Sequence, residues 1–245
     1  MIENQIILGD AYSLIKTLPD HSIDLIVTDP PYELTDNGYG STKDGKWYKR
    51  EYAKEITEEN LRSGIDLEIL DDFVRVLKKI NVYIFCNKEQ IYDYMTYFVK
   101  ERGCNFEFLI WAKTNPSPFA NNHYLKDKEY CLYFWEKGVR LNTTAERGKT
   151  VFVTNVNKAD KERYGHPTIK PEAIIESLIL NSSERGGLIL DPFIGSGTTA
   201  AAAKRLGRRY IGFEMNPKFH KIAIDRLNGV TQKELRSGYK QEKLF

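Results

Sequence analysis

GLILDPFIGSGTTAAAAKRL, residues 187–206, contains the parts of a strand–loop–helix unit. The apolar run 187–190 is typical of a short buried strand, and the alanine-rich run 197–206 favours a helix. Glycines in the loop between them let the backbone approach a ligand closely, and the N-terminus of a helix attracts an anionic group. The spacing matches neither the phosphate-binding loop that ends in Gly-Lys-Ser/Thr nor the dinucleotide pattern Gly-x-Gly-x-x-Gly. The stretch therefore predicts an α/β fold with a ligand site of another kind.

Two acids end the strands of this unit. Asp191 follows the run 187–190, and Glu214 follows the next apolar run, 210–213. An acid directly before the loop would repel a pyrophosphate, so Asp191 favours a ligand with an amino group or a positive charge. An acid at the end of the second strand commonly accepts hydrogen bonds from ribose hydroxyls, which is the role we expect for Glu214. An acid that favours the dipole of the following helix is the alternative for Glu214.

Strand-like and helix-like runs alternate along the rest of the chain, which predicts an α/β sheet with crossover connections. The expected strands are 6–8, 23–27, 82–86, 106–112, 130–135, 187–190 and 210–213. The runs 106–112 and 130–135 lack a helix between them and are expected to pair antiparallel. The expected helices are 11–18, 66–79, 88–102, 171–181, 197–206 and 217–227. Residues 33–60 are expected to form a loop or lid, and residues 229–245 a peripheral tail.

A second informative stretch, IDLIVTDPPY at residues 23–32, places the tetrad Asp29-Pro30-Pro31-Tyr32 directly after an apolar run. Ligands of open α/β sheets bind just outside the carboxyl ends of the strands, where this tetrad would lie. Successive prolines stiffen the chain and lack N–H donors, but their carbonyls remain free to accept. The carboxylate of Asp29, the carbonyl of Pro30 and the ring of Tyr32 therefore predict an arrangement that holds a planar amine.

Composition narrows the class of protein. The chain has 245 residues, 41% of them hydrophobic, which suits one large domain with a packed core. No run is long and apolar enough to cross a membrane, and the N-terminus lacks the pattern of a signal peptide. Three scattered cysteines, Cys86, Cys104 and Cys131, favour a reducing compartment and do not indicate a metal site. We therefore expect a cytoplasmic protein.

Basic residues are unevenly distributed, although the formal net charge is only +2. Residues 137–170 hold eight basic and three acidic side chains, a local net charge of +5. Such a cluster can steer and hold a phosphate backbone even when the whole chain is almost neutral. An ordinary solvated surface is the alternative that charge alone leaves open.

Together these stretches resemble the β class of S-adenosylmethionine-dependent DNA amino-methyltransferases. Residues 191–197 are similar to the cofactor loop of that family, and residues 29–32 are similar to its catalytic tetrad. Gly9-Asp10 resembles the motif whose acid binds the cofactor's adenine, and HPTIKP at 166–171 resembles the segment that covers its methionine end. The order, catalytic half first and cofactor half last, is that of the β class. The resemblance spans about residues 9–227 and implies a Rossmann-like, seven-stranded, mostly parallel sheet with one antiparallel strand, circularly permuted.

The resemblance also implies a set of site residues. The catalytic residues are Asp29, Pro30, Pro31 and Tyr32. The residues that bind S-adenosylmethionine are Asp10, His166, Thr168, Lys170, Asp191, Phe193, Gly195, Ser196, Gly197, Thr198, Glu214 and Asn216. DNA contacts lie in the target-recognition segment 138–165, whose basic candidates are Arg140, Arg147, Lys149, Lys158, Lys161 and Arg163. The chain is then one methyltransferase domain with a catalytic half at 1–137, this insert, a cofactor half at 166–228 and the tail.

The activity that the resemblance implies is methyl transfer to an exocyclic amine of a base in double-stranded DNA. That amine is a poor nucleophile, so acceptors at Asp29 and Pro30 would hold its hydrogens while Tyr32 stacks on the flipped-out base. In this family a tetrad that opens with Asp goes mainly with N6 of adenine, and one that opens with Ser mainly with N4 of cytosine, which remains the alternative. Methylation at cytosine C5 needs a cysteine nucleophile that typically follows a proline, and none of the three cysteines does.

Other interpretations remain open from the sequence. A methyltransferase for RNA or for a glutamine amide would use a related tetrad, but the motif order fits those enzymes poorly. A non-catalytic DNA-binding protein on this scaffold would be expected to lose the tetrad or the cofactor loop. Expected partners beyond double-stranded DNA are a second copy in a homodimer and, in a restriction–modification system, a cognate restriction endonuclease. An orphan enzyme and a phage-encoded protector of DNA are equally open.

Overall fold

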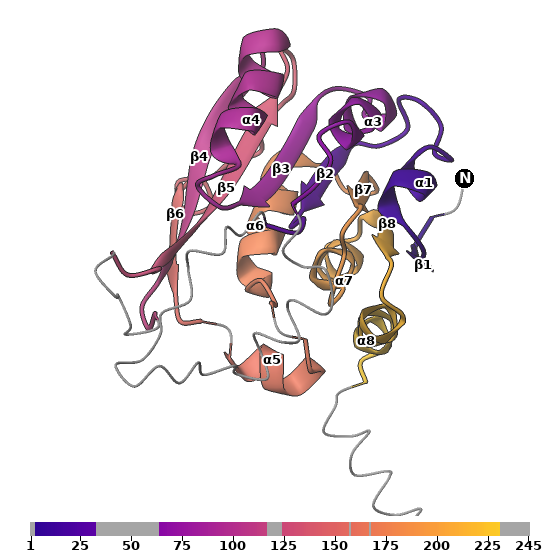
Figure 1. Cartoon of the computed structure of the whole chain (residues 1–245), viewed down its shortest axis with the longest axis vertical. Coiled ribbons are helices and arrows are strands. Elements are labelled where there is room, and N and C mark those ends of the chain that lie inside the picture. Colours follow the sequence, from indigo (N-terminus) through magenta and orange to yellow (C-terminus); the bar gives the residue numbers. More distant parts are fainter. Residues whose placement is uncertain (1–2, 33–63, 117–123, 157, 167, 231–245) are drawn as a thin grey trace, which may run out of the picture.

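The computed structural model describes residues 3–32, 64–116, 124–156, 158–166 and 168–230, and for residues 158–160 it describes the backbone alone. The loop or lid expected at 33–60 lies outside these residues, as does most of the tail expected at 229–245. Figure 1 shows the described chain as one sheet with helices against both of its faces.

A single mixed sheet runs through the described chain in the strand order β1-β8-β7-β2-β3-β5-β4-β6 (Figure 1). Its strands are β1 (Gln5–Leu8), β2 (Leu25–Thr28), β3 (Asn81–Cys86), β4 (Asn105–Lys113), β5 (Lys128–Trp135), β6 (Val151–Thr154), β7 (Leu188–Asp191) and β8 (Arg209–Glu214). Every neighbouring pair is parallel except the two pairs that involve β5. The N-terminal strand β1 lies beside the C-terminal strand β8, as the expected circular permutation requires.

The α/β class, the mostly parallel sheet and its one antiparallel strand confirm the fold expected from the sequence. Each expected strand is present, with its ends shifted by at most two residues. The sheet also contains an unpredicted eighth strand, β6, within the segment expected to recognise DNA. β6 pairs with β4 at the edge of the sheet. None of its four residues is buried, unlike those of β2 and β7, so β6 gains its place by pairing with β4 and not by a core-facing pattern.

Helices cover both faces of the sheet. One face packs against α1 (Ala11–Ile15), α3 (Ile69–Val76), α4 (Ile91–Met95) and the π-helical segment η2 (Thr96–Glu101). The other face packs against α6 (Glu172–Ser182), α7 (Thr198–Arg205) and α8 (Pro217–Leu227). In β2, Ile26 points into the first core whereas Leu25 and Val27 point into the second, so this strand is buried on both sides. The short helix α5 (Lys158–Tyr164) lies below the sheet in Figure 1.

Three helices differ from the lengths that their apolar patterns predict, α1 among them. The helix expected at 66–79 is α3, which ends at Val76 because Leu77 is extended and forms a bridge with Ile23, just before β2. The helix expected at 88–102 begins at Ile91 and widens into η2 from Thr96. The apolar stripe thus predicts the buried face of a helix better than it predicts where the helix ends.

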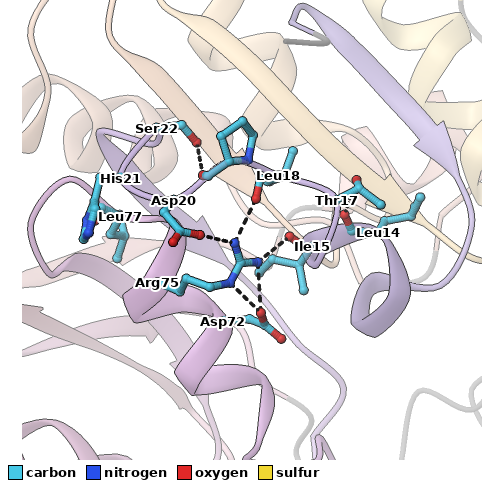
Figure 2. A network of polar contacts seen from close by, with 11 residues as sticks. Leu14, Ile15, Thr17, Leu18, Asp20, His21, Ser22, Asp72, Arg75 and Leu77 are labelled. Carbon is cyan, nitrogen blue, oxygen red and sulfur yellow. Dashed lines mark hydrogen bonds and ion pairs between the residues drawn. The ribbon is translucent and has the colours of Figure 1, made fainter.

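Arg75 of α3 fixes the turn that follows α1 (Figure 2). Helix α1 ends at Ile15, short of the expected 11–18, and the chain then wraps around the Arg75 guanidinium. That group donates to the carbonyl oxygens of Ile15 and Leu18 at 2.9 and 2.8 Å. It also pairs with Asp20 at 2.7 Å and with Asp72 at 3.0 Å. This network holds the segment that leads into β2, the strand that carries the tetrad.

None of the described helices is long and apolar enough to span a membrane. Cys86, Cys104 and Cys131 are buried and free. Burial raises the pKa of Cys86 to about 12, so this thiol is packed as an apolar side chain. Among the described residues, no group of three or more side chains could hold a metal ion.

Candidate active site

A cavity of about 590 Å³ opens at the carboxyl edge of the parallel strands. Three acids line the cavity at the ends of neighbouring strands, because β8, β7 and β2 are adjacent in the sheet. Glu214 ends β8, Asp191 ends β7, and Asp29 follows β2. The whole tetrad lines this cavity, as do all the predicted cofactor residues except Gly197. The fold therefore brings together two predicted half-sites that lie at opposite ends of the chain.

Asp191 is buried at the end of β7, where several donors hold its carboxylate. The hydroxyl of Thr28 donates to Asp191 Oδ1 at 2.9 Å, and the backbone N–H of Phe193 donates to the same oxygen at 3.2 Å. Burial nevertheless raises the pKa of Asp191 to about 7. A positively charged ligand would complete the ionisation of this carboxyl and would be bound by it in return.

Glu214 holds the glycine loop that turns over the cavity. Its Oε2 accepts a hydrogen bond from the N–H of Gly195 at 2.9 Å, and its Oε1 accepts from the N–H of Asn216 at 2.8 Å. Gly195 has a φ of +52°, and a Cβ there would lie 3.2 Å from Nε2 of His166. Glycine is required at this position both for its backbone conformation and for the space that the imidazole occupies.

His166 presents an unsatisfied donor at the cavity wall. The residue is 4% exposed, and its Nδ1 accepts from the N–H of Thr168 at 3.2 Å, which places the proton of the neutral ring on Nε2. No partner for Nε2 is present among the described residues. Burial and the nearby cations, Lys170 first, lower the pKa of His166 to about 3, so the ring is neutral at pH 7. A buried N–H of this kind beside a cavity indicates a place for an acceptor of a ligand.

Two further predicted cofactor residues line the cavity and also cap helices. Oδ2 of Asp10 accepts from the N–H and the hydroxyl of Ser13 at 3.0 and 2.8 Å, which caps α1. Oδ1 of Asn216 accepts from the N–H of Lys218 at 2.9 Å, which caps α8. The cap of α8 is therefore Asn216, and Glu214 faces the loop and the cavity instead.

Gly197 is the predicted cofactor residue that the structure assigns to another role. It does not line the cavity but faces α8, where a Cβ would lie 3.0 Å from Cα of Ala223. Its neighbours Ser196 and Thr198 do line the cavity, and the hydroxyl of Thr198 accepts from the buried guanidinium of Arg226 at 2.8 Å. Gly197 thus packs the loop against a helix while the residues beside it face the ligand space.

An aromatic pair stands beside Asp10. Tyr12 makes an edge contact with Phe193, with the ring centroids 6.3 Å apart, and both side chains line the cavity. The hydroxyl of Tyr12 accepts from the N–H of Asp66 at 2.8 Å, which holds the ring in position. Two rings beside a carboxylate suit a flat heterocycle. Tyr12 was not predicted, although an aromatic residue two positions after the motif acid was the signal.

The tetrad occupies the side of the cavity nearest β3 and β5. The hydroxyl of Tyr32 donates to Asp29 Oδ1 at 2.9 Å and also lies 3.3 Å from Oε2 of Glu129. Burial raises the pKa of Asp29 more than the ammonium of Lys170 lowers it, so Asp29 is more basic than an ordinary carboxylate. A half-buried carboxylate with a raised pKa is suited to hold an amine and then to take up its proton.

An ion-pair network surrounds Asp29. The ammonium of Lys170 pairs with Asp29 Oδ2 and lies 3.1 Å from Oε2 of Glu129, whose Oε1 lies 2.6 Å from the ammonium of Lys113. Lys170 was predicted among the cofactor residues, and the structure places its ammonium on the tetrad. Glu129 and Lys113 were not predicted. Their signal was a pair of opposite charges at the adjoining ends of strands β4 and β5.

The predicted DNA-contacting residues are divided between two sides of the sheet: the side where the parallel strands end and the cavity opens, and the opposite side, where those strands begin. Strand β5 runs away from the cavity, so the chain after Trp135 emerges at the opposite edge. There Arg147 donates to the carbonyl of Asn142 at 3.0 Å, and the N–H of Asn142 donates to the carbonyl of Asn181 at the end of α6. Arg140 is exposed in the same stretch. The structure does not bring Arg140 or Arg147 to the cavity.

The remainder of the basic segment returns to the cavity. Because β6 runs parallel to β4, α5 follows it at the same edge of the sheet as the tetrad. Lys161 of α5 lines the cavity, and the exposed Arg163 lies with its guanidinium 5.3 Å from the ring centroid of Tyr164. Lys149 is exposed two residues before β6, and the side chain of Lys158 lies outside the described residues. Of the predicted basic side chains that the structure describes, Lys161 lines the cavity and Arg163 belongs to the same helix.

Comparison with known proteins assigns the chain to a family. The family model described as DNA methylase, for N6 and N4 enzymes, matches residues 23–225. The Type II methyltransferase M2.LlaDCHI of Lactococcus lactis subsp. cremoris is 31% identical and the match covers 92% of this chain and 90% of that protein. The Type II methyltransferase M2.DpnII of Streptococcus pneumoniae is 30% identical with the same coverage. The crystal structure of the M1.HpyAVI–SAM complex superposes with a TM-score of 0.66 at 26% identity, covering 91% of this chain and 99% of that one. The chain belongs to the DNA methylase family.

Proposed function

We propose that this member of the DNA methylase family transfers the methyl group of S-adenosylmethionine to the N6 amine of an adenine flipped out of double-stranded DNA. The observation that carries the proposal is the position of Asp29, whose half-buried carboxylate shares one cavity with the glycine loop and the donor of His166. One cavity therefore offers an acceptor for an amine and a separate place for a methyl donor. N4 of cytosine is the alternative target for the same geometry.

The residues at the glycine loop fit the methionine end of S-adenosylmethionine, which supplies a methyl group on a positively charged sulfur. Asp191 would face the cofactor's amino group, since a cation completes the ionisation of that buried carboxyl. The unsatisfied Nε2–H of His166 would donate to the cofactor's carboxylate. The absence of a side chain at Gly195 leaves room for the cofactor against the loop.

The residues after β1 and β8 fit the adenosine end. Glu214 would accept hydrogen bonds from the ribose hydroxyls while it keeps its bond to the N–H of Gly195. Tyr12 and Phe193 would hold the adenine ring, with Asp10 beside them as an acceptor for its amine. The cofactor residues would thus follow one another along the cavity in the strand order β1, β8, β7.

Asp29 and Pro30 act on the target amine. The carboxylate of Asp29 and the carbonyl of Pro30 would accept its two hydrogens and direct its lone pair at the methyl group. The new N–C bond would form as the C–S bond of S-adenosylmethionine breaks, which leaves S-adenosylhomocysteine. The ring of Tyr32 stacks on the base while its hydroxyl holds Asp29 at 2.9 Å. The methylated amine carries a positive charge until it loses a proton, and the raised pKa of Asp29 favours uptake of that proton. No covalent intermediate with the protein is needed.

Adenine is favoured over cytosine because the tetrad opens with Asp29, the residue found mainly in the adenine enzymes that this chain resembles. DNA is favoured as the polymer by the motif order and by the family. A base inside a duplex cannot reach the recessed Asp29, so it must leave the helix. Lys161, which lines the cavity, and Arg163 of the same helix would hold the phosphates beside the flipped base.

We also propose that the enzyme acts in the cytoplasm as the modifying half of a restriction–modification system, with a cognate restriction endonuclease as its counterpart. The relatives named Type II methyltransferases support this role. A homodimer is the assembly that we expect to read the target, because the recognition segment is short and part of it, at Arg140 and Arg147, faces away from the cavity.

Transfer of a radiolabelled methyl group from S-adenosylmethionine tests the class of substrate. Double-stranded DNA, RNA and a mixture of proteins are offered to the purified chain under identical conditions. We expect label in DNA alone, with incorporation that stops once every site is methylated. Label in RNA or protein, or no transfer to DNA of several different sequences, would contradict the proposal.

A further inference from the structure

Lys170 holds its ammonium at the place where the target amine must bind. The side chain is 7% exposed, and its Nζ pairs with Asp29 and with Glu129. The same Nζ lies 5.4 Å from the ring centroid of Tyr32 and 5.1 Å from that of Phe85. The cation therefore lies at the tetrad, between the aromatic walls of the space into which a base would insert.

Glu129 anchors this ammonium independently of Asp29. Burial alone would raise the pKa of Glu129, but Lys170 and Lys113 together lower it to about 2, so the carboxylate is charged at any pH at which the protein works. Burial alone would lower the pKa of Lys170, but Asp29 and Glu129 raise it above its ordinary value. The four groups form a charge-balanced set, and Lys170 keeps a strong acceptor at 3.1 Å even when Asp29 is engaged elsewhere.

The edge of the target base requires a donor as well as acceptors. Adenine presents its N6 amine next to the ring nitrogen N1, which is an acceptor, and cytosine presents N4 next to the acceptor N3. Asp29 and Pro30 supply acceptors, so neither can bond that ring nitrogen. A flipped base is recognised by hydrogen bonds to its Watson–Crick edge, and an unsatisfied buried acceptor there would be costly.

We propose that Lys170, anchored by Glu129, donates a hydrogen bond to the ring nitrogen beside the target amine, so that Asp29 and Lys170 together select the base. The inference rests on the proposed role of Asp29. When the target amine binds Asp29, it displaces the N–H that Lys170 donates to that carboxylate. The released N–H turns to the adjoining ring nitrogen while Glu129 holds the rest of the ammonium. Lys170 is thereby moved from the predicted cofactor set to the base.

Such a pair excludes the other two bases. Guanine and thymine carry an N–H at the corresponding position of their Watson–Crick edges, which would face the ammonium of Lys170 and repel it. A donor at the ring nitrogen also draws electrons away from the exocyclic amine. We therefore assign the contact to binding and orientation of the base rather than to the nucleophilicity of its amine, and we expect its loss to act mainly on KM.

A chemical double-mutant cycle tests the contact. Wild-type protein and Lys170→Met are assayed on duplexes that carry, at the methylated position, either adenine or 1-deazaadenine, in which a C–H replaces N1. For wild type we expect the analogue to lower kcat/KM about tenfold to hundredfold, the worth of a hydrogen bond from a charged donor. With adenine, Lys170→Met should have a kcat/KM lower than that of wild type by a similar factor. Replacing adenine with 1-deazaadenine should then lower the kcat/KM of this variant by less than about threefold. Changes in base pairing and in intrinsic reactivity are common to both proteins and cancel.

Matched controls keep the result interpretable. Lys170→Gln, which retains a neutral donor, is assayed beside Lys170→Met, and cofactor titration confirms that both variants are folded. A duplex with 7-deazaadenine alters the far edge of the base and should show no coupling to Lys170. If cytosine proves to be the target, 3-deazacytosine takes the place of 1-deazaadenine.

The outcomes separate the two claims. The contact is supported if the analogue and Lys170→Met together lower kcat/KM by much less than the product of their separate effects. Losses that multiply, or a wild-type protein indifferent to the analogue, overturn the role of Lys170 while the proposed function stands. A wild-type protein that methylates no DNA base overturns the proposed function and this inference with it.

Discussion

The two ends of the cavity are built in different ways. At the cofactor end, the N–H groups of Phe193 and Gly195 hold Asp191 and Glu214 within the strand–helix–strand unit 188–214, and Thr28 adds one bond from β2. At the base end, Asp29, Glu129 and Lys170 hold one another through ion pairs between distant segments. A contiguous motif can therefore set the cofactor end, whereas the base end exists only after β2, β4 and β5 have come together in the sheet.

The two ends also differ in charge balance. Asp191 is a buried acid whose pKa is raised to about 7, and no ammonium is paired with it among the described residues. Glu129 is a half-buried acid whose pKa two ammonium groups lower to about 2. The cofactor end therefore requires a cation from its ligand, whereas the base end already contains its own.

Replacement of Asp29 should separate the two ends most strongly. Asp29→Ala removes the acceptor of the amine and the base that takes its proton, so we expect methyl transfer to fall at least about a thousandfold. Cofactor affinity, measured by calorimetric titration, should change less than about threefold, since Asp29 supplies none of the hydrogen bonds that hold Asp191 and Glu214. Asp29→Asn, which keeps the shape but not the charge, is the matched control and should also be severely impaired. Turnover within about tenfold of wild type would contradict the assignment.

The pKa of Asp191 predicts how cofactor affinity depends on pH. Below pH 7 the free protein carries a proton on Asp191 that a bound cation must expel, so affinity should fall by up to about tenfold per pH unit as the pH drops. Above pH 7 the carboxyl is already ionised, and affinity should level off. Asp191→Asn should bind the cofactor at least about tenfold more weakly at high pH and lose this dependence. The same exchange at Asp10 should leave the dependence in place, and an unchanged profile in Asp191→Asn would show that another group titrates.

The two glycines of the cofactor loop should respond differently to the same substitution. Gly195→Ala and Gly197→Ala both place alanine at a positive φ, +52° and +78°, so each should lower the free energy of unfolding in urea by about 1–3 kcal/mol. Only Gly195→Ala should weaken cofactor binding, by about tenfold, because its Cβ displaces His166. Equal losses of cofactor affinity in both variants would show that Gly197 also serves the ligand.

The smallest effect is expected on DNA affinity, from replacing either of two exposed arginines. Arg163 and Arg140 lie on opposite sides of the sheet, so the two variants form a matched comparison. Arg163→Ala, on the helix beside the cavity, should weaken DNA binding a few-fold and reduce the slope of log affinity against log salt by about one. Arg140→Ala removes the same charge at the far edge and should leave both quantities unchanged within error. Fluorescence anisotropy with a labelled duplex measures both. A larger effect at Arg140 would place the DNA, or a second subunit, on the far edge.

The fold was predictable because its strands are apolar runs of ordinary length. In β2 each residue is buried, so the run at 23–27 stands out from the polar chain around it. Strand β6 has only four residues, two of them exposed, and gains its place by pairing with β4 rather than by its own pattern. The ends of α1 and α3 were missed because Arg75 and Leu77 impose them through contacts with other segments. Tertiary contacts, not local propensity, decide such ends.

The predictability of the site follows the same division. Asp191, Gly195 and Glu214 belong to contiguous motifs, and the structure places all three on the cavity wall. Glu129 and Lys113 belong to no motif, and the antiparallel pairing of β5 with β4 brings them together. Sequence spacing also says nothing about the edge of the sheet on which a basic segment lies. Residues 138–165 cross from one edge to the other, so a charge cluster that is continuous in sequence is divided in space.

Identification of the methylated nucleoside tests the central claim most directly. DNA methylated by the purified chain with labelled S-adenosylmethionine is digested to nucleosides, which are separated and identified by mass. The account predicts that the label is found in N6-methyldeoxyadenosine, that it disappears with Asp29→Ala, and that the methylated adenines share one sequence context. Label in N4-methyldeoxycytidine would move the target to the alternative base, and label that persists with Asp29→Ala would contradict the account itself.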